Sequence, residues 1–500
     1  MSRPLASRLV LSGILVNRTA LHIGSGSTSA LTDMPVARDG AGRLHIPGTS
    51  LAGPIRHLCQ RRFGQEAIEE LFGYTGPHGT EGKAGRILID DAPTESSAVE
   101  LRDHVVIAAE TGTAKPGFKF DREIVPPETK FRLRIEVEIP PADEEGDDRR
   151  ENFMTMLATI RHALKVGEVC LGGSSTRGLG RVQMTEDDVT EERFDKKQAT
   201  LDTLKARFGL TKPTKASLPE CRYRSEHLTI TIGWKPIEPL MVRAGIEGEG
   251  VDALPLVTSI NGQLHAVLGG SSIKGTLRSH ARKIVNTLGV ESTIVDCLLG
   301  APKATPKGGK DKHKGPKLGK SALSVADIHA RRSLSPTEWQ KLVDTKDVVL
   351  VASELRNTKW NGSGISHHVA IDRWTGGAAE NLLYTRLEPG DLEWPDIVME
   401  IDFHFLQEHD EAAIALLVLL LQDMVHGQIR LGGQVNRGMG AIEINKLEMD
   451  AIGNGTATVL KGLTLADGAL QLPDDALKLL QKAWSKALGA TADQGGDQSS

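Results

Sequence analysis

Two aspartates stand in loops of small residues, each shortly before a proline. Asp33 lies in ALTDMP and Asp252 in GVDALP. An exposed loop carboxylate can bind a divalent metal ion, or carry out general acid–base chemistry on a hydroxyl such as a ribose 2′-OH. The alternative is an Asx turn, in which the carboxylate only satisfies nearby backbone N–H groups. His22, His45 and His265 are candidate partners, although no His/Asp/Glu cluster has the spacing of a metal site.

Small residues also precede two predicted helices. The segments PGTSLAG (47–53) and GGSSIKG (269–275) place Gly, Ser and Thr where a helix N-terminus exposes free N–H groups, which suits a phosphate. An ordinary N-cap beside a solvated arginine explains the same pattern in one copy, whereas its recurrence favours phosphate binding. The candidate ligands are Ser50, Arg56, Ser272, Lys274 and Arg278.

A second glycine-rich pattern, GGxxxRGxG, occurs as GGSSTRGLGRV (172–182) and GGQVNRGMGAI (432–442). Glycines allow a polyanion to approach the backbone, and Arg177, Arg181 and Arg437 can donate to phosphate oxygens. The alternative is a glycine-rich turn between a helix and a strand. The pattern lacks GK[ST] and precedes a strand, so it is not a nucleotide-binding loop of the Walker type.

These motifs recur in the same order, so the chain contains two diverged copies of one unit. Asp252 follows Asp33 by 219 residues, and the segments that enter the helices are 222 apart. DHVVIAAETG (103–112) matches HHVAIDRWTG (367–376) at a distance of 264, and the GGxxxRGxG blocks are 260 apart. The increase from 222 to 264 indicates an insertion in the second copy, for which 301–320 is the best candidate.

The insertion is a local region of positive charge that the overall charge of the chain does not show. The 500 residues include 60 Lys and Arg against 65 Asp and Glu, a formal charge of −5, which excludes a uniformly basic nucleic-acid binder. The insertion carries seven lysines and one aspartate. It is either a solvated loop or an electrostatic contact to nucleic acid, with Lys312 and Lys314 as candidates. Since aromatic residues make up only 4%, binding should depend on phosphate contacts more than on base stacking.

The cysteines and apolar segments indicate the compartment. The four cysteines are far apart and form no CxxC pair, which is typical of free thiols in a reducing cytoplasm. The longest apolar run, 412–421, is shorter than the roughly 20 residues that a bilayer span requires. We therefore expect a cytoplasmic protein without a membrane partner.

The elements that must position the motifs follow one pattern in both copies. Alternating apolar residues predict strands, and apolar spacings of three or four predict helices. The predicted strands are 8–16, 131–139 and 182–184, then 227–234, 397–405 and 442–444. The predicted helices are 47–63 and 152–166, then 273–284 and 411–426. Each unit is thus β, helix, β, helix, β, an α+β fold with the helices on one face of a sheet.

The repeat also predicts the domain organisation, since a chain of this length exceeds one compact core. Residues from about 490 onward are small and polar, and we expect them to be disordered. The predicted parts are a first unit at 1–205, a linker at 206–225, a second unit at 226–450 with the insertion 301–320, and a C-terminal extension at 451–500.

The ordered motifs resemble the RAMP superfamily, in particular the Cas-seven-type backbone subunits of type III CRISPR effector complexes of the Csm and Cmr kind. The match is carried by ALTDMP and GVDALP, by PGTSLAG and GGSSIKG, by HHVAIDRWTGGA and by the two GGxxxRGxG blocks. Two units in one chain resemble the fused subunits of type III-D systems. The resemblance covers most of the chain outside the insertion, the linker and the tail.

This resemblance implies a modified ferredoxin-like (RRM-like) fold for each unit, stacked along a guide crRNA with other effector subunits. The guide selects complementary target RNA by base pairing, while the protein holds the backbone. In the family the loop aspartate is needed for metal-dependent cleavage of the target. Asp33 and Asp252 are therefore the catalytic candidates, with Mg²⁺ or Mn²⁺ as the cofactor. Arg373 lies where the family has a thumb-like hairpin that contacts the guide.

Two other functions remain compatible with the sequence. A structural scaffold would bind crRNA while Asp33 and Asp252 only cap turns, and other subunits would cut the target. A nuclease that matures the guide would instead cut repeat RNA before assembly.

Overall fold

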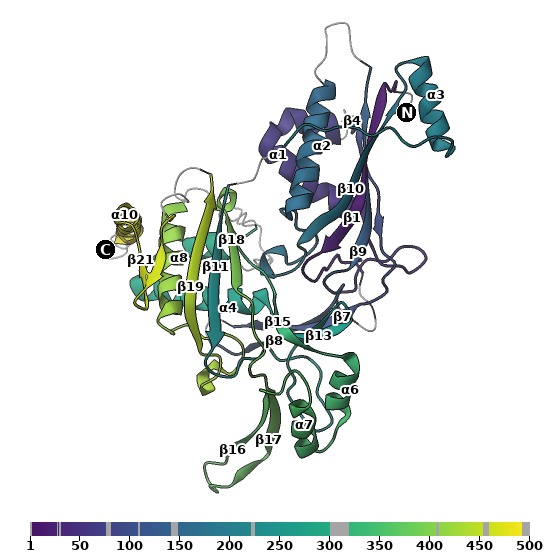
Figure 1. Ribbon diagram of the computed structural model, residues 1–500. Coiled ribbons are helices and arrows are strands. Elements are labelled where there is room, and N and C mark those ends of the chain that lie inside the picture. Colours follow the sequence, from purple (N-terminus) through teal and green to yellow (C-terminus); the bar gives the residue numbers. More distant parts are fainter. Residues whose placement is uncertain are drawn as a thin grey trace. The chain divides into compact units, whose positions relative to one another are not determined.

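The computed structural model describes residues 3–27, 29, 32–76, 82–108, 111–141, 149–221, 226–300, 320–406, 410–453 and 460–492 (Figure 1). The predictions for Lys312 and Lys314, and for the tail from 493 onward, lie outside the described residues. Contacts divide the chain into two compact units. Unit 1 comprises Met1–His104, Phe120–Ser175 and Leu179–Arg224, and unit 2 comprises Val105–Lys119, Thr176–Gly178 and Ser225–Ser500.

The first repeat is built on a four-stranded antiparallel sheet of order β10-β1-β9-β5. Numbered along the chain, these strands are fourth, first, third and second, the arrangement of a βαββαβ ferredoxin-like fold. The strands are β1 (Ser7–Asn17), β5 (Ile87–Ile89), β9 (Lys130–Ile139) and β10 (Val182–Arg193), and the helices are α1 (Gly48–Phe72) and α2 (Arg149–Val166). The predicted α+β fold is confirmed.

Strict alternation decides which face of this sheet carries the helices. In β9 every second residue from Phe131 to Ile139 is buried, as a half-exposed strand requires. These side chains pack with Leu11 of β1 and with Leu157 of α2 in one hydrophobic cluster. Figure 1 shows α1 and α2 on the same side of β1 and β10.

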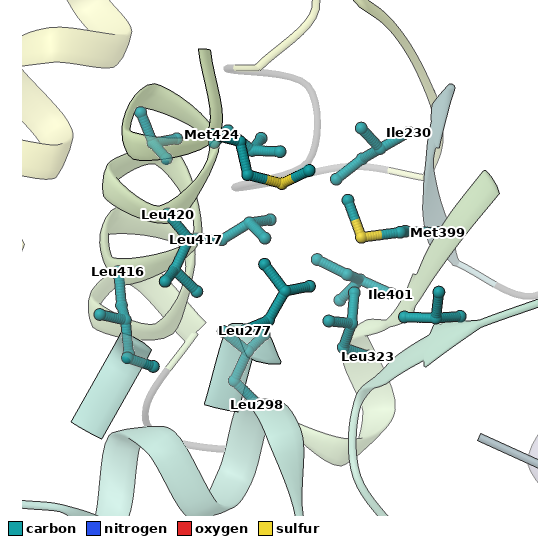
Figure 2. Packing of buried hydrophobic residues seen from close by; sticks show 14 of the residues in the cluster. Ile230, Leu277, Leu298, Leu323, Met399, Ile401, Leu416, Leu417, Leu420 and Met424 are labelled. Atoms are coloured by element: carbon teal, nitrogen blue, oxygen red, sulfur yellow. The ribbon is translucent and has the colours of Figure 1, made fainter. Parts of the chain in front are cut away.

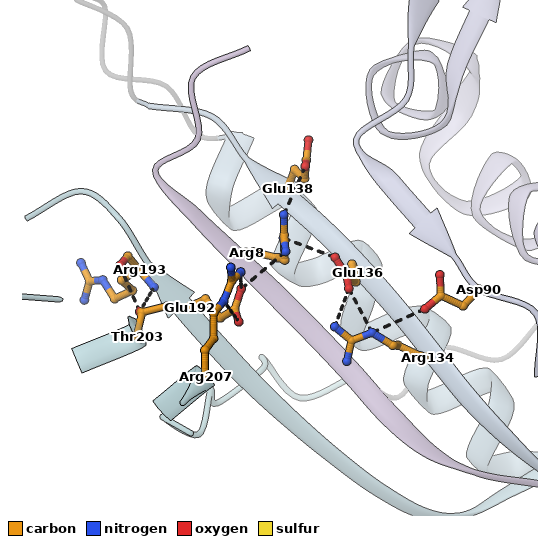
Figure 3. A network of polar contacts seen from close by, with 9 residues as sticks. All are labelled: Arg8, Asp90, Arg134, Glu136, Glu138, Glu192, Arg193, Thr203 and Arg207. Carbon is orange, nitrogen blue, oxygen red and sulfur yellow. Dashed lines mark hydrogen bonds and ion pairs between the residues drawn. The ribbon is translucent and has the colours of Figure 1, made fainter. Parts of the chain in front are cut away.

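The other face of the sheet carries charges instead (Figure 3). Arg8, on the central strand β1, lies 3.3 Å from Glu136 of β9 and 3.6 Å from Glu192 of β10. The short helix α3 (Lys197–Arg207) joins this network, because Arg207 pairs with Glu192 through Nε at 2.8 Å. The network covers the open face with paired charges.

The second repeat has the same strand order, β14-β18-β11-β19. Its strands are β11 (His227–Pro236), β14 (Leu323–Val325), β18 (Ile397–Asp402) and β19 (Ile442–Ile452), and its helices are α4 (Gly270–Leu288), α5 (Thr293–Leu299) and α8 (Asp410–Val425). Figure 2 shows Ile230 and Met399 of the sheet facing Leu417 and Leu420 of α8, with Leu277 of α4 between them.

The repeats share a local irregularity in the first strand. The pairing of β1 with β10 shifts between Ile14 and Leu15, and that of β11 with β19 shifts between Gly233 and Trp234. The two shifts are 219 residues apart, the distance that separates the aspartate loops. One predicted element ends early: the strand expected at 397–405 stops at Asp402, whose side chain accepts from His404 N at 3.1 Å and starts a 3₁₀ turn.

Each repeat carries an inserted β-hairpin between its second and third sheet strands. The hairpins are β7 (Glu100–Ile107) with β8 (Ala114–Ile124), and β16 (Gly364–Ile371) with β17 (Ala378–Glu388). The same histidine–aromatic stack occurs in both, His104 on Phe120 with ring centroids 5.1 Å apart and His368 on Tyr384 at 5.0 Å.

The second repeat also contains a small subdomain around Trp339 and Trp360, which are buried and 6.0 Å apart. A capping box from Ser335 and Glu338 begins its first helix. The subdomain comprises β12 (Val257–Ile260), β13 (Gln263–Leu268), β15 (Ile328–Leu334), α6 (Pro336–Asp344) and α7 (Val348–Arg356).

Short elements complete both parts. Helix α10 (Asp474–Ala492) lies against α8, and its Leu480 and Trp484 join the hydrophobic cluster that includes α8. In the predicted linker, Ala216 N donates to Val189 O at 2.8 Å, so this part of the linker runs beside β10. The remaining elements are β2 (His45–Ile46), β3 (Gly73–Thr75), β4 (Gly82–Ala84), β6 (Ala92–Pro93), β20 (Thr464–Ala466), β21 (Ala469–Gln471) and α10 (Asp474–Ala492).

The cysteines are free thiols, as predicted. Burial raises the pKa of Cys59 to about 12, so this thiol is unreactive at neutral pH. None of the helices in the described ranges has the length and apolar content needed to cross a membrane.

Candidate functional site

The Asp33 loop is tied to the end of β8 by reciprocal hydrogen bonds. Asp33 N donates to Asp121 Oδ1 at 2.7 Å, and Asp121 N donates to Asp33 Oδ2 at 3.1 Å. Thr32 Oγ1 donates to the same Asp121 oxygen at 2.7 Å. The Asp33 side chain is exposed. This is more than a local Asx turn, because a strand 88 residues away holds the loop and places a second carboxylate beside the first.

The Asp252 loop is held in the same way by β17. Thr385 N donates to Asp252 Oδ2 at 2.6 Å, Thr385 Oγ1 donates to that oxygen at 2.9 Å, and Asp252 N donates to Thr385 Oγ1 at 3.1 Å. Thr385 follows Asp121 by 264 residues, the distance between the hairpins. The structure thus places both predicted aspartates equivalently, with a threonine in place of the second carboxylate.

A buried arginine stands next to each of these partners and was not among the predicted residues. Arg122 is 6% exposed and Arg386 1%. Their backbones pair in parallel with the residue after each aspartate, Met34 with Arg122 and Ala253 with Arg386. A signal for them was present, since FDREI (120–124) and YTRLE (384–388) lie 264 apart, as the preceding matched block does.

Each buried arginine reaches the glycine-rich turn. Arg122 Nη1 donates to Ser174 Oγ at 2.6 Å, and Arg386 Nη1 donates to Gln434 Oε1 at 2.7 Å. Ser174 and Gln434 both have positive φ, 62° and 59°. This left-handed backbone is uncommon for residues other than glycine, so the two copies have kept the same unusual turn.

One glycine of this turn in each repeat is needed for close contact within the protein's own backbone. A Cβ on Gly180 would lie 2.0 Å from Leu171 O, and one on Gly440 would lie 2.0 Å from Leu431 O. Gly180 and Gly440 therefore allow two protein segments to meet, whereas a Cβ on Gly438 would have no atom within 4 Å, and the approach of a polyanion to that glycine stays a prediction. Arg177 and Arg437 end the 3₁₀ turns Ser175–Arg177 and Val435–Arg437 and are exposed.

The arginines of the turns are partly fixed. Arg437 Nη1 donates to Tyr384 OH at 2.8 Å, and Gln434 Nε2 donates to the same hydroxyl at 2.9 Å. Arg181 is half-buried, and its backbone N–H donates to Thr19 Oγ1 at 3.0 Å. In the second repeat, one tyrosine therefore connects the hairpin, the turn and the exposed arginine.

The helix N-termini do not form the open nests expected for phosphate. Gly48 N donates to Asp91 Oδ1 at 2.7 Å, and Gly270 N donates to Asp327 Oδ1 at 2.8 Å. An aspartate from beyond β5 or β14 thus caps each helix and brings negative charge to its start. The side chains of Ser50 and Ser272 are half-buried at these positions, and their RNA contacts stay predictions.

The basic residues of these helices differ in exposure. Lys274 is 4% exposed, and its ammonium donates to Leu323 O at 2.6 Å and to Ser321 Oγ. Burial, with the nearby positive charges, lowers its pKa to about 7. The ammonium of Lys274 thus already donates to oxygens of the protein, and its contact to RNA stays a prediction. Arg278 Nη2 pairs with Asp296 Oδ1 at 3.0 Å, and Arg56 is half-buried.

The tip of the second hairpin is exposed. Arg373 and Trp374 lie in its turn, and Trp374 is 96% exposed. Asp372 Oδ1 orders the turn by accepting from Trp374 N and Thr375 N, each at 2.8 Å. These hydrogen bonds hold the pKa of Asp372 below its usual value.

The structure therefore brings three predicted motifs together in each repeat: the aspartate loop, the hairpin and the glycine-rich turn. Within the described ranges, no group of three or more His, Cys, Asp or Glu side chains could hold a metal ion by itself. A profile of the RAMP superfamily matches residues 15–183 and 235–443. The chain belongs to the RAMP superfamily. Both ferredoxin-like sheets are thus RAMP domains, arranged in tandem.

The chain is also similar to two proteins named Csm3. It is 31% identical over 213 residues to the "CRISPR system Cms endoribonuclease Csm3" of Mycobacterium tuberculosis, which covers 36% of this chain and 87% of the relative. It is 28% identical over 209 residues to the Csm3 protein of Methanocaldococcus jannaschii, covering 36% of this chain and 80% of the relative. Each match spans about the length of one RAMP domain.

Proposed function

We propose that this chain is a crRNA-binding backbone subunit of a type III CRISPR effector complex, and that it cleaves guide-complementary target RNA at Asp33 and Asp252. Two RAMP domains and similarity to proteins named Csm3 endoribonuclease support the proposal. The observation that carries it is the equivalent placement of the two aspartates, each exposed and each fixed by the base of its hairpin. Its partners are the guide crRNA, the target RNA and other effector subunits.

A carboxylate that caps only its own turn would need no such anchoring. Each aspartate is held by a residue far along the chain, Asp121 or Thr385. This anchoring favours a catalytic role for the two aspartates over the alternative, in which they only cap turns of a structural scaffold.

The donor atoms fit a divalent cation that shares its coordination with RNA. Mg²⁺ is typically bound through one or two carboxylates together with substrate phosphates. Asp33 and Asp121 offer two adjacent carboxylates, and Asp252 offers one beside the Thr385 hydroxyl. Mg²⁺ or Mn²⁺ held there would stabilise the negative charge that develops on the phosphate during cleavage.

The residues of the chain would then act on a splayed target nucleotide. The ribose 2′-oxygen attacks the adjacent phosphorus, and the bond from phosphorus to the 5′-oxygen breaks, which leaves a cyclic phosphate and a 5′-hydroxyl. The loop aspartate orients the 2′-hydroxyl and accepts its proton, and the leaving oxygen takes a proton from water. Arg177 and Arg437 are exposed within the same repeats and supply donors to RNA phosphates.

The experiment maps the cuts that the ribonucleoprotein, purified through this chain, makes in a guide-complementary RNA. Asp33→Asn should abolish one cut and Asp252→Asn another, with RNA binding unchanged, because the amide keeps the shape but not the charge. Asp202→Ala, at an exposed position of α3, is the matched control. Unchanged cuts in both asparagine variants would contradict catalysis by the aspartates and support the structural scaffold instead. Cutting of repeat RNA by the unassembled chain would instead indicate guide maturation.

A further inference from the structure

Arg386 is a costly residue to bury. Its side chain is 1% exposed, and in the described part of the chain its Nε and Nη2 atoms have no hydrogen-bond partner. A buried guanidinium keeps its charge, so incomplete pairing destabilises the fold. Burial indeed lowers its pKa. Packing therefore gives no reason for an arginine at this position.

The backbone of Arg386 lies beside the aspartate loop. Ala253 N donates to Thr385 O at 3.1 Å, and Leu387 N donates to Ala253 O at 3.0 Å. The backbone of the residue after the aspartate is thus hydrogen-bonded to the residue before the arginine and to the residue after it. In the first repeat, Glu123 N likewise donates to Met34 O at 3.0 Å.

The side chain of Arg386 extends from there to the turn. It donates to Gln434, which has positive φ and precedes the 3₁₀ turn that ends at the exposed Arg437. Arg122 makes the corresponding contact to Ser174. The acceptors differ in type, yet the same nitrogen of each arginine reaches the same turn position, 260 residues apart. Both repeats therefore have the hydrogen bond from the buried arginine to the turn, although its acceptor is a serine hydroxyl in one and a glutamine amide in the other.

We infer that Arg122 and Arg386 are positioning residues, each of which holds the aspartate loop of its own repeat against the glycine-rich turn. The inference rests on the proposed function. In the second repeat the link fixes the distance between Asp252 and the exposed Arg437, for which a contact to RNA phosphate is predicted, and in the first repeat it fixes Asp33 relative to Ser174. Misplacing reacting groups by about 1 Å costs on the order of 100-fold in rate, so the link acts on the chemical step.

The test uses single-turnover cleavage by the assembled ribonucleoprotein, with the rate at each cut measured over a range of target concentrations. Arg386→Met should lower the saturating rate at the Asp252-dependent cut about 10- to 100-fold. The half-saturating RNA concentration and the rate at the Asp33-dependent cut should stay within a factor of two or so. Arg122→Met should do the reverse, so each cut is the internal control for the other.

Two further variants separate positioning from folding. Arg386→Lys should recover part of the rate, because an ammonium can still donate to Gln434. Gln434→Ala should reproduce the loss while leaving the buried arginine in place. Equal losses at both cuts, or a loss confined to RNA affinity, would overturn the inference.

Failure of the proposed function gives a different result. If Asp252→Asn leaves every cut intact, the catalytic proposal fails. If Asp252→Asn removes its cut while Arg386→Met cuts at the normal rate, only the positioning role fails.

Discussion

Asp33 faces a second carboxylate, whereas Asp252 faces a hydroxyl. The contact geometry is otherwise the same, since each partner accepts from the aspartate N–H and donates its own N–H to the carboxylate. Carboxylates raise the affinity of a site for divalent cations more than hydroxyls do. The two repeats therefore differ in the charge that they offer to a cation.

This difference predicts unequal metal requirements. The Asp33-dependent cut should reach half its maximal rate at a Mg²⁺ concentration roughly tenfold lower than the Asp252-dependent cut. Thr385→Asp should lower the requirement at the second site, and Asp121→Thr should raise it at the first. Cleavage over a Mg²⁺ titration measures both, and identical titration curves for the two cuts would contradict the prediction.

At the scale of elements, α3 is held to the open face of the first sheet by charge. Glu192 accepts from Arg207 of α3 and lies near Arg8 of β1. The hydrogen bond from Arg207 is the main reason that the pKa of Glu192 is below its usual 4.5. An exposed ion pair of this kind contributes about 0.2–1 kcal/mol.

The pH dependence of α3 follows from that shift. Because the folded-state pKa of Glu192 is lowered, its contribution is complete above about pH 4.5 and is lost as the pH falls through the lowered value. The protection factors of the amides in 197–207, which compare their exchange with that of an unstructured chain at the same pH, should therefore fall as the pH drops below about 4.5. Arg207→Ala should give low protection factors at every pH, and high salt should act in the same direction. Lys205→Ala is the control, since its ion pair with Asp202 lies within the helix.

Lys274 on α4 predicts a pH dependence of the stability of the fold, in this case because burial of a basic group lowers its pKa. Its pKa falls from 10.5 to about 7 on folding. Between these values the unfolded chain binds the proton that the folded chain has released, so stability rises with pH by at most about 1.4 kcal/mol per unit.

Urea unfolding from pH 6 to 10 measures this effect. Lys274→Met should be more stable than the native chain at pH 6, and the difference should shrink as the pH rises above 7. Lys283→Met, at an exposed position of α4, should show no such trend. A constant difference for Lys274→Met over this range would contradict the lowered pKa.

Across the whole molecule, the sequence predicted the fold well. The alternation of apolar residues that predicts each strand is local in the chain, and the repeat offsets matched the elements of one copy to those of the other. The unpredicted features all depend on contacts between distant segments. Asp91 caps α1 from beyond β5, and Arg122 reaches Ser174. The burial of Lys274 depends on β14, which follows the lysine-rich insertion. The matched spacing of FDREI and YTRLE marks Arg122 as a repeated residue, but it does not indicate that the arginine is buried or that Ser174 is its partner.

The total charge of −5 conceals the insertion at 301–320. Deleting 302–319 should weaken crRNA binding most at low salt and reduce the slope of affinity against salt, because fewer phosphates are neutralised. A Gly/Ser segment of equal length is the control for chain connectivity. An unchanged salt slope would show that these lysines do not contact RNA.

The charges on the open face of the first sheet have a consequence for a chain with two sheets of one design. Tandem copies can exchange strands while they fold. Arg8 of β1 lies opposite Glu192 of β10, whereas the corresponding residues of the second sheet, His227 and Ile452, include no carboxylate. Exchange of the two closing strands would leave Arg8 opposite an aliphatic side chain and remove Glu192 from its partners. The network in Figure 3 thus favours pairing of the first strand, β1, with the closing strand of its own repeat, β10, over pairing with the closing strand of the second repeat.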